Sequence, residues 1–153
     1  MTEYLLKEGD RAPSFTLAGI DEEFTLADYP RVILYFYSKD NTAGCTKQAL
    51  AFNEAYEDLT KRGYVIAGVS KDSVASHQKF AAKHNLRFHL LADTDCQVAE
   101  AYGVRRQKMM YGRQVMGTVR SAFIIEDGVI AQTLYNIKAE SSAAEVSKYL
   151  TRA

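Results

Sequence analysis

The sequence has little cysteine and no excess of charge of either sign. Its 153 residues include two cysteines, Cys45 and Cys96, so each has to be judged by its own surroundings. Lys plus Arg and Asp plus Glu both total 19, which gives a formal net charge of zero. A neutral chain has no general attraction to nucleic acid or to an anionic membrane, so both kinds of partner are disfavoured.

Long hydrophobic runs and an export signal are also missing. The longest apolar run, Val32–Tyr37, is far shorter than the roughly 20 residues that a membrane-spanning helix needs. The first ten residues contain acidic side chains and have neither an apolar core nor a small-residue cleavage site. We therefore expect a cytoplasmic protein with both cysteines as thiols at rest, because disulfides in reducing compartments are usually transient and catalytic.

The bulk composition is that of an ordinary globular protein. Hydrophobic residues make up 47% and charged residues 25% of the chain, which argues against disorder and against a fibrous class. No linker, internal repeat or low-complexity segment divides the sequence. We expect a single domain spanning residues 1–153.

Apolar periodicity predicts strands that alternate with helices. The runs Val32–Tyr37 and Tyr64–Val69 are typical of buried strands, and apolar residues at helical spacing follow each of them, up to Gly63 and Asn85. A short strand at His89–Leu91 precedes a helix through Tyr102 that Asp93 or Thr94 can cap. Two runs, Val119–Ile125 and Val129–Leu134, indicate a hairpin, and Ser142 with Glu145 forms a capping-box pattern for a last helix.

This order of elements predicts an α/β fold, a mixed central sheet with helices on both faces. Residues 105–116, between the predicted helices and the hairpin, show neither the hydrophobic period of a helix nor that of a strand. We expect a long irregular loop there, basic and rich in methionine. Its charges, Arg105, Arg106, Lys108 and Arg113, are more typical of a solvated loop than of a docking site in a neutral protein.

Cys45 follows a strand and opens a helix, which is an unusual position for a packing cysteine. Unpaired N–H groups at a helix N-terminus stabilise a thiolate, the nucleophilic form of cysteine. Gly44 lets a substrate approach the backbone closely, and Thr42 offers a hydroxyl near the sulfur. The pattern alone leaves alternatives open: a turn glycine, a helix N-cap and an inert buried thiol.

The residues around Cys45 also carry a family resemblance. The run Phe36–Thr46 resembles the peroxiredoxin motif Pro-x-x-x-Thr-x-x-Cys, with Thr42 and Cys45 in register. Further matches follow in order along the chain, at Gly9–Phe15, Leu90–Asp93, Tyr102–Val104 and Arg120. On these matches the chain is similar to peroxiredoxins of the bacterioferritin-comigratory, or Q, type in the AhpC/TSA superfamily.

The resemblance implies a thioredoxin-like fold and a thiol-dependent peroxidase that reduces hydrogen peroxide and organic hydroperoxides without a cofactor. Cys45 would become a sulfenic acid, Thr42 and Arg120 would be catalytic, and Gly44 and Ser38 would contact the substrate. Thioredoxin, glutaredoxin or a low-molecular-weight thiol would serve as the reductant. Similar proteins are often monomers, so we expect a monomer or a weak dimer.

Three positions depart from the family pattern. Ser38 and Ala43 stand where prolines are common, which predicts a more flexible or more solvated loop. Leu50 stands where many Q-type members carry a resolving cysteine. Cys96, expected in the first turn of a helix beside two aspartates, is a weak candidate for that role, so we predict a one-cysteine route with an external thiol.

Other functions have less support in the sequence. A peroxide sensor that does not turn over, or a binding module that has lost the chemistry, would have the same fold. The sequence has no Cys-x-x-Cys pair, and this absence argues against a disulfide reductase. His77 and His84 could share a helix face, but two histidines without a nearby carboxylate or thiol ligand set do not make a metal site, so we expect none.

Overall fold

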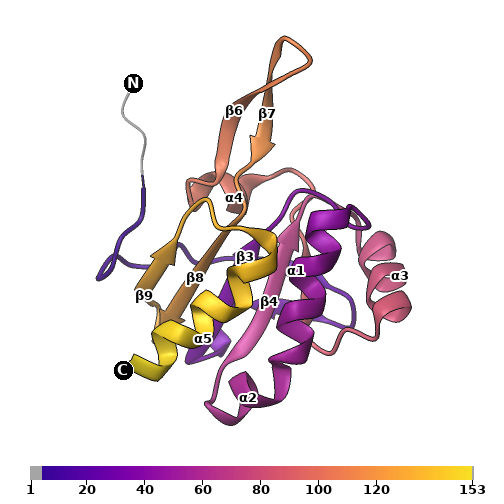
Figure 1. The fold of residues 1–153 in the computed structure, drawn as a ribbon. Helices are drawn as coiled ribbons and strands as arrows, with labels where there is room; N and C mark the ends of the chain where they lie inside the picture. Colours follow the sequence, from indigo (N-terminus) through magenta and orange to yellow (C-terminus); the bar gives the residue numbers. More distant parts are fainter. Residues whose placement is uncertain (1–4, 153) are drawn as a thin grey trace.

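The computed structural model describes residues 5–152, in which strands and helices alternate along most of the chain (Figure 1). The strands are β1 Thr16–Gly19, β2 Glu23–Thr25, β3 Arg31–Phe36, β4 Val65–Ser70, β5 His89–Ala92, β6 Arg105–Met110, β7 Arg113–Thr118, β8 Ser121–Glu126 and β9 Val129–Leu134. The helices are α1 Ala43–Glu54, α2 Tyr56–Lys61, α3 Val74–His84, α4 Gln97–Ala101 and α5 Ser142–Arg152, with short 3-10 turns at Leu26–Asp28 and Ala139–Ser141.

The central sheet has seven strands in the order β2-β1-β5-β4-β3-β8-β9. β3, β4 and β5 are parallel, whereas β1, β8 and β9 add antiparallel pairs at the two sides. This is the mixed thioredoxin-like α/β sheet that the sequence predicted. β1 and β2 were not predicted, because each is short and only partly buried.

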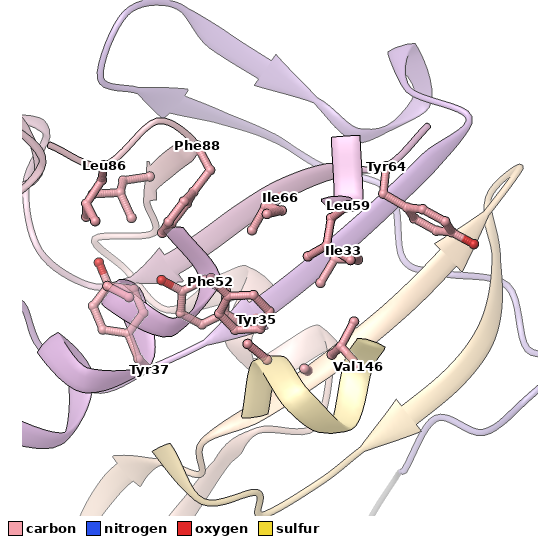
Figure 2. Close-up of a cluster of buried hydrophobic side chains, with 14 of the residues drawn as sticks. Ile33, Tyr35, Tyr37, Phe52, Leu59, Tyr64, Ile66, Leu86, Phe88 and Val146 are labelled. Atoms are coloured by element: carbon pink, nitrogen blue, oxygen red, sulfur yellow. The ribbon is translucent and has the colours of Figure 1, made fainter. Parts of the chain in front are cut away.

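β3 divides the hydrophobic core into two clusters. Its side chains alternate between the sheet faces, so Ile33 and Tyr35 join one cluster while Val32 and Leu34 join the other. Figure 2 shows part of the first cluster, with Tyr35 beside Phe52 of α1. A strand with two buried faces explains why its sequence is a continuous apolar run.

Helices cover both faces of the sheet, as predicted. The first cluster takes residues from α1, α2, α3 and α5, and Figure 1 shows α1 and α5 lying over the sheet. α4 and the N-terminal segment pack into the second cluster on the opposite face. No helix among residues 5–152 is long and apolar enough to cross a membrane.

Residues 105–116 are not an irregular loop, and that prediction was wrong. They form most of the antiparallel pair β6–β7, which projects from the body of the protein (Figure 1). Its turn residues, Tyr111 and Gly112, both have positive φ, as a two-residue type I′ turn requires. Much of the ribbon is exposed, including Met109 and Met116, so no buried face gives the sequence its period-two signal.

Several helix ends also differ from the prediction. The expected helix up to Gly63 is divided at Ala55 into α1 and α2. α5 begins at Ser142, yet the Ser142 hydroxyl donates to the Ala139 carbonyl, and Glu145 accepts from the neighbouring Ser141 hydroxyl. Local polar contacts therefore replace the expected capping box.

α3 was predicted more closely. Ser73 caps its N-terminus by accepting a hydrogen bond from the Ser76 amide, and Asn85 ends it in the left-handed conformation.

Candidate active site

Cys45 lies in the first turn of α1, where the sequence predicted it. β3 ends at Phe36, and α1 begins at Ala43 after a short loop, with Thr42 as the cap residue. The Cys45 side chain is 1% exposed. The first amides of a helix lack intrahelical acceptors and carry a partial positive charge, so this position favours a thiolate.

Arg120 reaches the sulfur from a distant part of the chain. Its Nη1 lies 3.4 Å from Cys45 Sγ, although 75 positions separate the two residues. The pairing of β3 with β8 explains the approach, because Phe36 at the end of β3 is paired with Ser121, the neighbour of Arg120. The guanidinium therefore lies near the C-terminal end of β3, where the loop that leads to Cys45 begins.

Two hydroxyls of the same loop lie close to the sulfur. Ser38 Oγ is 3.6 Å from Cys45 Sγ. The Thr42 hydroxyl donates to the Lys39 carbonyl at 2.9 Å. A hydroxyl has one proton and rotates freely, so Thr42 can direct that proton to the carbonyl or to a thiolate.

The surroundings of Cys45 favour its ionised form. Burial by itself would raise the pKa of the Cys45 thiol. Four neighbours act against burial and bring this pKa below its ordinary value: the Thr42 hydroxyl, the Lys39 backbone, the Ser38 hydroxyl and the Arg120 guanidinium. The thiol is thus shielded from bulk water and still activated as a nucleophile.

Gln48 belongs to this group, although the sequence analysis did not select it. It lies one turn after Cys45 on α1, is fully buried, and accepts a hydrogen bond from Arg120 Nη1 at 2.7 Å. The same guanidinium nitrogen therefore contacts both the sulfur and the amide oxygen. A polar residue three positions after the nucleophile, on the inner face of a helix, is the signal that could have identified it.

Gly44 makes room for the arginine. A Cβ atom at this position would lie 3.1 Å from Arg120 Nη2, closer than ordinary van der Waals contact. Any larger residue would push the guanidinium away from the sulfur. The sequence suggested that Gly44 lets a substrate approach the backbone. The structure shows that it also leaves space for the Arg120 guanidinium.

Cys96 does not join the group around Cys45. It is the cap residue of α4, with a left-handed φ of 60°, rather than a residue of the first helical turn. Asp93 caps this helix instead, because its carboxylate accepts from the amides of Val98 and Ala99. Cys45 belongs to the core cluster on one face of the sheet, whereas Cys96 packs against the cluster on the opposite face.

His77 has the carboxylate neighbour that the sequence did not reveal. Its Nδ1 lies 2.7 Å from Asp40 Oδ2, and both side chains are buried. Asp40 is 37 positions earlier and belongs to the loop before Cys45. The expectation that no carboxylate lies near His77 was therefore wrong, because the contact depends on packing between distant segments.

Comparison with known proteins adds independent information. A model of the AhpC/TSA family matches residues 8–133. The peroxiredoxin bcp of Coxiella burnetii is 43% identical over 145 residues, which cover 92% of this chain and 96% of that protein. The similarity therefore extends over nearly the full length of both chains.

Solved structures agree with the sequence matches. Xylella fastidiosa PrxQ superposes with a TM-score of 0.91 at 32% identity and covers 97% of this chain, with 98% of its own length matched. The Xanthomonas campestris bacterioferritin comigratory protein, studied for its alkyl peroxide reduction activity, gives a TM-score of 0.85 at 36% identity, with 90% of each chain covered. The fold and the sequence thus point to the same group of proteins.

Proposed function

This chain belongs to the AhpC/TSA family and is a thiol-dependent peroxidase of the Bcp/PrxQ type, and we propose that Cys45 is its peroxidatic residue. The observation that carries this proposal is the contact of Arg120 with a buried sulfur whose pKa lies below its ordinary value. A nucleophile that is activated and shielded suits peroxide better than larger electrophiles.

In the proposed reaction the Cys45 thiolate attacks the terminal oxygen of the hydroperoxide. The sulfur–oxygen bond forms while the oxygen–oxygen bond breaks, so sulfur is oxidised and the peroxide is reduced. The terminal oxygen keeps its hydrogen and becomes part of the sulfenic acid, and the leaving hydroxide or alkoxide takes a proton to form water or alcohol. Cys45 is left as a sulfenic acid.

Arg120 and Thr42 stabilise the charge that moves during this step. Negative charge leaves the sulfur and develops on the departing oxygen, so fixed donors close to both atoms lower the barrier. Arg120 keeps its positive charge at any relevant pH and presents several N–H groups in a rigid plane. Its bond to the buried Gln48 amide fixes that plane, which makes Gln48 a positioning residue.

Gly44 and Ser38 are assigned to the mouth of the site. Ser38 is exposed and adjacent to the sulfur, so its hydroxyl is available to a peroxide oxygen. Hydrogen peroxide and organic hydroperoxides share the terminal O–O–H group that these contacts recognise. Both are therefore proposed as substrates, and no cofactor enters the reaction.

We assign the reduction of the sulfenic acid to an external thiol. One reductant thiol displaces water and forms a mixed disulfide with Cys45, and a second thiol then releases Cys45 as the reductant is oxidised to its disulfide. The position five after Cys45 is Leu50, and Cys96 packs on the other face of the sheet. Neither residue favours an internal disulfide.

We propose a thioredoxin, a glutaredoxin or a low-molecular-weight thiol as the reductant, and the cytoplasm, where such thiols are kept reduced, as the site of the reaction. Because Cys45 is 1% exposed, the first turn of α1 or the preceding loop has to open before a reductant thiol can reach the sulfur. We propose a single domain, 1–153, and a monomer or weak dimer, because the proposed catalytic groups all come from one chain.

Cys45→Ser tests the assignment directly. A serine hydroxyl stays protonated at neutral pH, so we expect peroxide consumption with a thiol reductant to fall to the background rate while the fold is retained. Peroxide loss and reductant oxidation are followed together, with circular dichroism as the check on folding.

Cys96→Ser is the matched control and should keep the first oxidation of Cys45. Peroxide consumption by Cys45→Ser at the wild-type rate would refute the proposal. Oxidation of wild-type Cys45 without repeated turnover would instead indicate a peroxide sensor.

A further inference from the structure

A buried polar cluster attaches the loop before Cys45 to the rest of the protein. Asp40 lies in this loop but is only 4% exposed. Its carboxylate accepts hydrogen bonds from the Tyr37 hydroxyl at 2.6 Å and from the Ser76 hydroxyl at 2.8 Å, and it lies 2.7 Å from His77 Nδ1. One loop residue therefore contacts both Tyr37, the residue directly after β3, and helix α3.

The hydrogen bonds of His77 define its protonation state. Its Nε2 lies 3.0 Å from the Leu91 carbonyl, which can only accept, so this nitrogen carries a proton. Burial alone would raise the pKa of Asp40, but hydrogen bonds from His77, Tyr37 and Ser76 and the charge of His77 hold that pKa below its ordinary value. An ionised Asp40 also only accepts, so His77 Nδ1 donates to it and the ring is an imidazolium.

The same contacts favour an ion pair over a metal site. The donor atoms of Asp40, Asp72 and His77 all lie within 4.8 Å of one another. Both ring nitrogens of His77 are engaged as donors, and Asp72 Oδ2 accepts from the Asp40 amide at 2.8 Å and from the Ser70 hydroxyl at 2.6 Å. A cation would have to displace several of these hydrogen bonds and the His77 protons.

The position of Asp40 connects this cluster to the sulfur. Ser38 and Lys39 precede Asp40, and Thr42 follows two positions later, so the three groups that stabilise the thiolate from the loop lie on either side of the anchor. Both the amide and the carboxylate of Asp40 are bound. A loop held at this residue keeps its hydroxyls near Cys45 Sγ.

We propose that His77 is a positioning residue of the peroxidase reaction, whose imidazolium holds Asp40 and thereby keeps the 38–42 loop closed over the Cys45 thiolate. Removal of the His77 ring leaves the buried Asp40 carboxylate without its cation, and the loop opens toward solvent. An open loop shields the sulfur less and supplies fewer hydrogen bonds to the thiolate. The proposal thus extends the proposed function by naming the contact that sets access to Cys45.

The titratable groups around this ion pair come from two other segments. Tyr37, directly after β3, donates to Asp40, and Asp72, in the turn before α3, accepts a hydrogen bond from the Asp40 amide. The pKa of Tyr37 is raised above its ordinary value, by burial first and by Asp40 among other neighbours, so this phenol stays neutral. Asp72 Oδ2 lies in the same cluster and also accepts from the Ser70 hydroxyl.

The test compares two reactions of Cys45 in His77→Gln. Oxidation by hydrogen peroxide should slow by roughly tenfold, a factor in line with the loss of one charge-assisted hydrogen bond. Alkylation by iodoacetamide, compared at the high-pH plateau where all the thiol is ionised, should become faster because the sulfur is more accessible. An unfolded fraction would also slow oxidation and expose the sulfur, so both rates are measured on protein that circular dichroism shows to be folded. In folded protein, opposite changes of the two rates identify a positioning role.

His84→Gln is the matched control, because His84 lies at the C-terminal end of the same helix and its ring contacts Phe80. Both of its rates should equal those of the wild type. Asp40→Asn is the second variant in case His77→Gln does not fold. An amide at position 40 can donate to a neutral His77, so the shape of the side chain is kept while the charge pair is removed. Oxidation should again be slower and alkylation faster than in the wild type, by smaller factors than in His77→Gln.

Rates within twofold of wild type in folded His77→Gln, or in Asp40→Asn, would overturn the proposal, as would a parallel fall of both rates. Alkylation requires no peroxide, so the loop can be tested even if Cys45→Ser retained peroxidase activity.

Discussion

Arg120 acts on Cys45 through a charge that does not titrate near neutral pH. Its guanidinium contacts the sulfur and is one of the groups that lower the pKa of the Cys45 thiol. The sign of the effect is therefore fixed. Above this lowered pKa the thiolate predominates, and as the pH falls through it the nucleophile is lost.

Replacement of this arginine should separate charge from geometry. We expect Arg120→Met to raise the pKa of Cys45 and to slow its oxidation by about 100-fold, the usual cost of losing an oxyanion donor. Arg120→Lys should have smaller effects on both, because an ammonium restores charge but not the rigid pair of N–H groups. Iodoacetamide alkylation against pH gives the pKa, and stopped-flow oxidation gives the rate.

An unchanged alkylation profile in Arg120→Met would contradict the electrostatic role. Gln48→Leu is a useful companion variant, because it leaves the charge at position 120 and removes only the hydrogen bond that orients it. Its oxidation rate should fall while the arginine stays in place.

At the scale of single residues, the sequence identified the groups whose role depends on neighbours along the chain. Thr42, Gly44 and Cys45 lie in one loop and one helical turn, so their chemistry can be predicted from local spacing. Gln48 and His77 were not identified as functional. Each acts through a partner that is 72 or 37 positions away, so the contact itself cannot be predicted from local sequence. The spacing of Gln48, three positions after Cys45, indicates only that the two share a helix face.

Among the elements, β3, β4 and α1 are held together by a close contact. Gly68 of β4 leaves space for the Tyr35 ring, because a Cβ atom there would lie 2.7 Å from Tyr35 Cζ. The same ring stacks on Phe52 of α1 with 4.6 Å between the centroids. Gly68 thus helps to set the position of the Tyr35 ring, which packs against Phe52 of α1, the helix that carries Cys45 (Figure 2).

Gly68→Ala should lower the free energy of unfolding by about 1–3 kcal/mol, because the extra methyl overpacks the core. In a Tyr35→Leu background the same change should cost less, since leucine lacks the ring atoms that meet the methyl group. Urea unfolding of the four proteins measures the coupling. Equal costs in the two backgrounds would show that the ring is not the cause.

Hydrophobic periodicity predicted the buried strands but not the exposed ones. β3 and β4 were predicted because burial on both faces gives continuous apolar runs. The β6–β7 ribbon was mistaken for a loop, because its strands pair with each other and leave much of their surface in solvent. Hydrogen-bonded pairing without a buried face does not impose a hydrophobic pattern.

For the whole molecule, the location of the two cysteines decides how the catalytic cycle closes. Cys45 and Cys96 pack into core clusters on opposite faces of the sheet. A disulfide requires their Cα atoms to come within about 7 Å, which demands displacement of packed elements. Opening of one loop and one helical turn disturbs much less of the core.

We therefore expect stoichiometric peroxide to give a Cys45 sulfenic acid or a mixed disulfide with an added thiol. Non-reducing peptide mapping of the wild type and of Cys96→Ser measures these products, and turnover of the two proteins with a thiol reductant should be equal. A dominant Cys45–Cys96 disulfide within one chain, with turnover lost in Cys96→Ser, would make Cys96 the resolving residue.

The sequence by itself determined the alternation of strands and helices, the position of Cys45 at a helix N-terminus, and the family to which the chain belongs. These properties depend on burial patterns and on short motifs, which are local. The family resemblance also selected Arg120, but only the tertiary structure showed how distant side chains meet the active-site segment. Strand pairing brings Arg120 to Cys45, and packing of α3 brings His77 to Asp40. Such contacts are fixed by the arrangement of the sheet and its helices, and the spacing of residues along the chain carries no record of them.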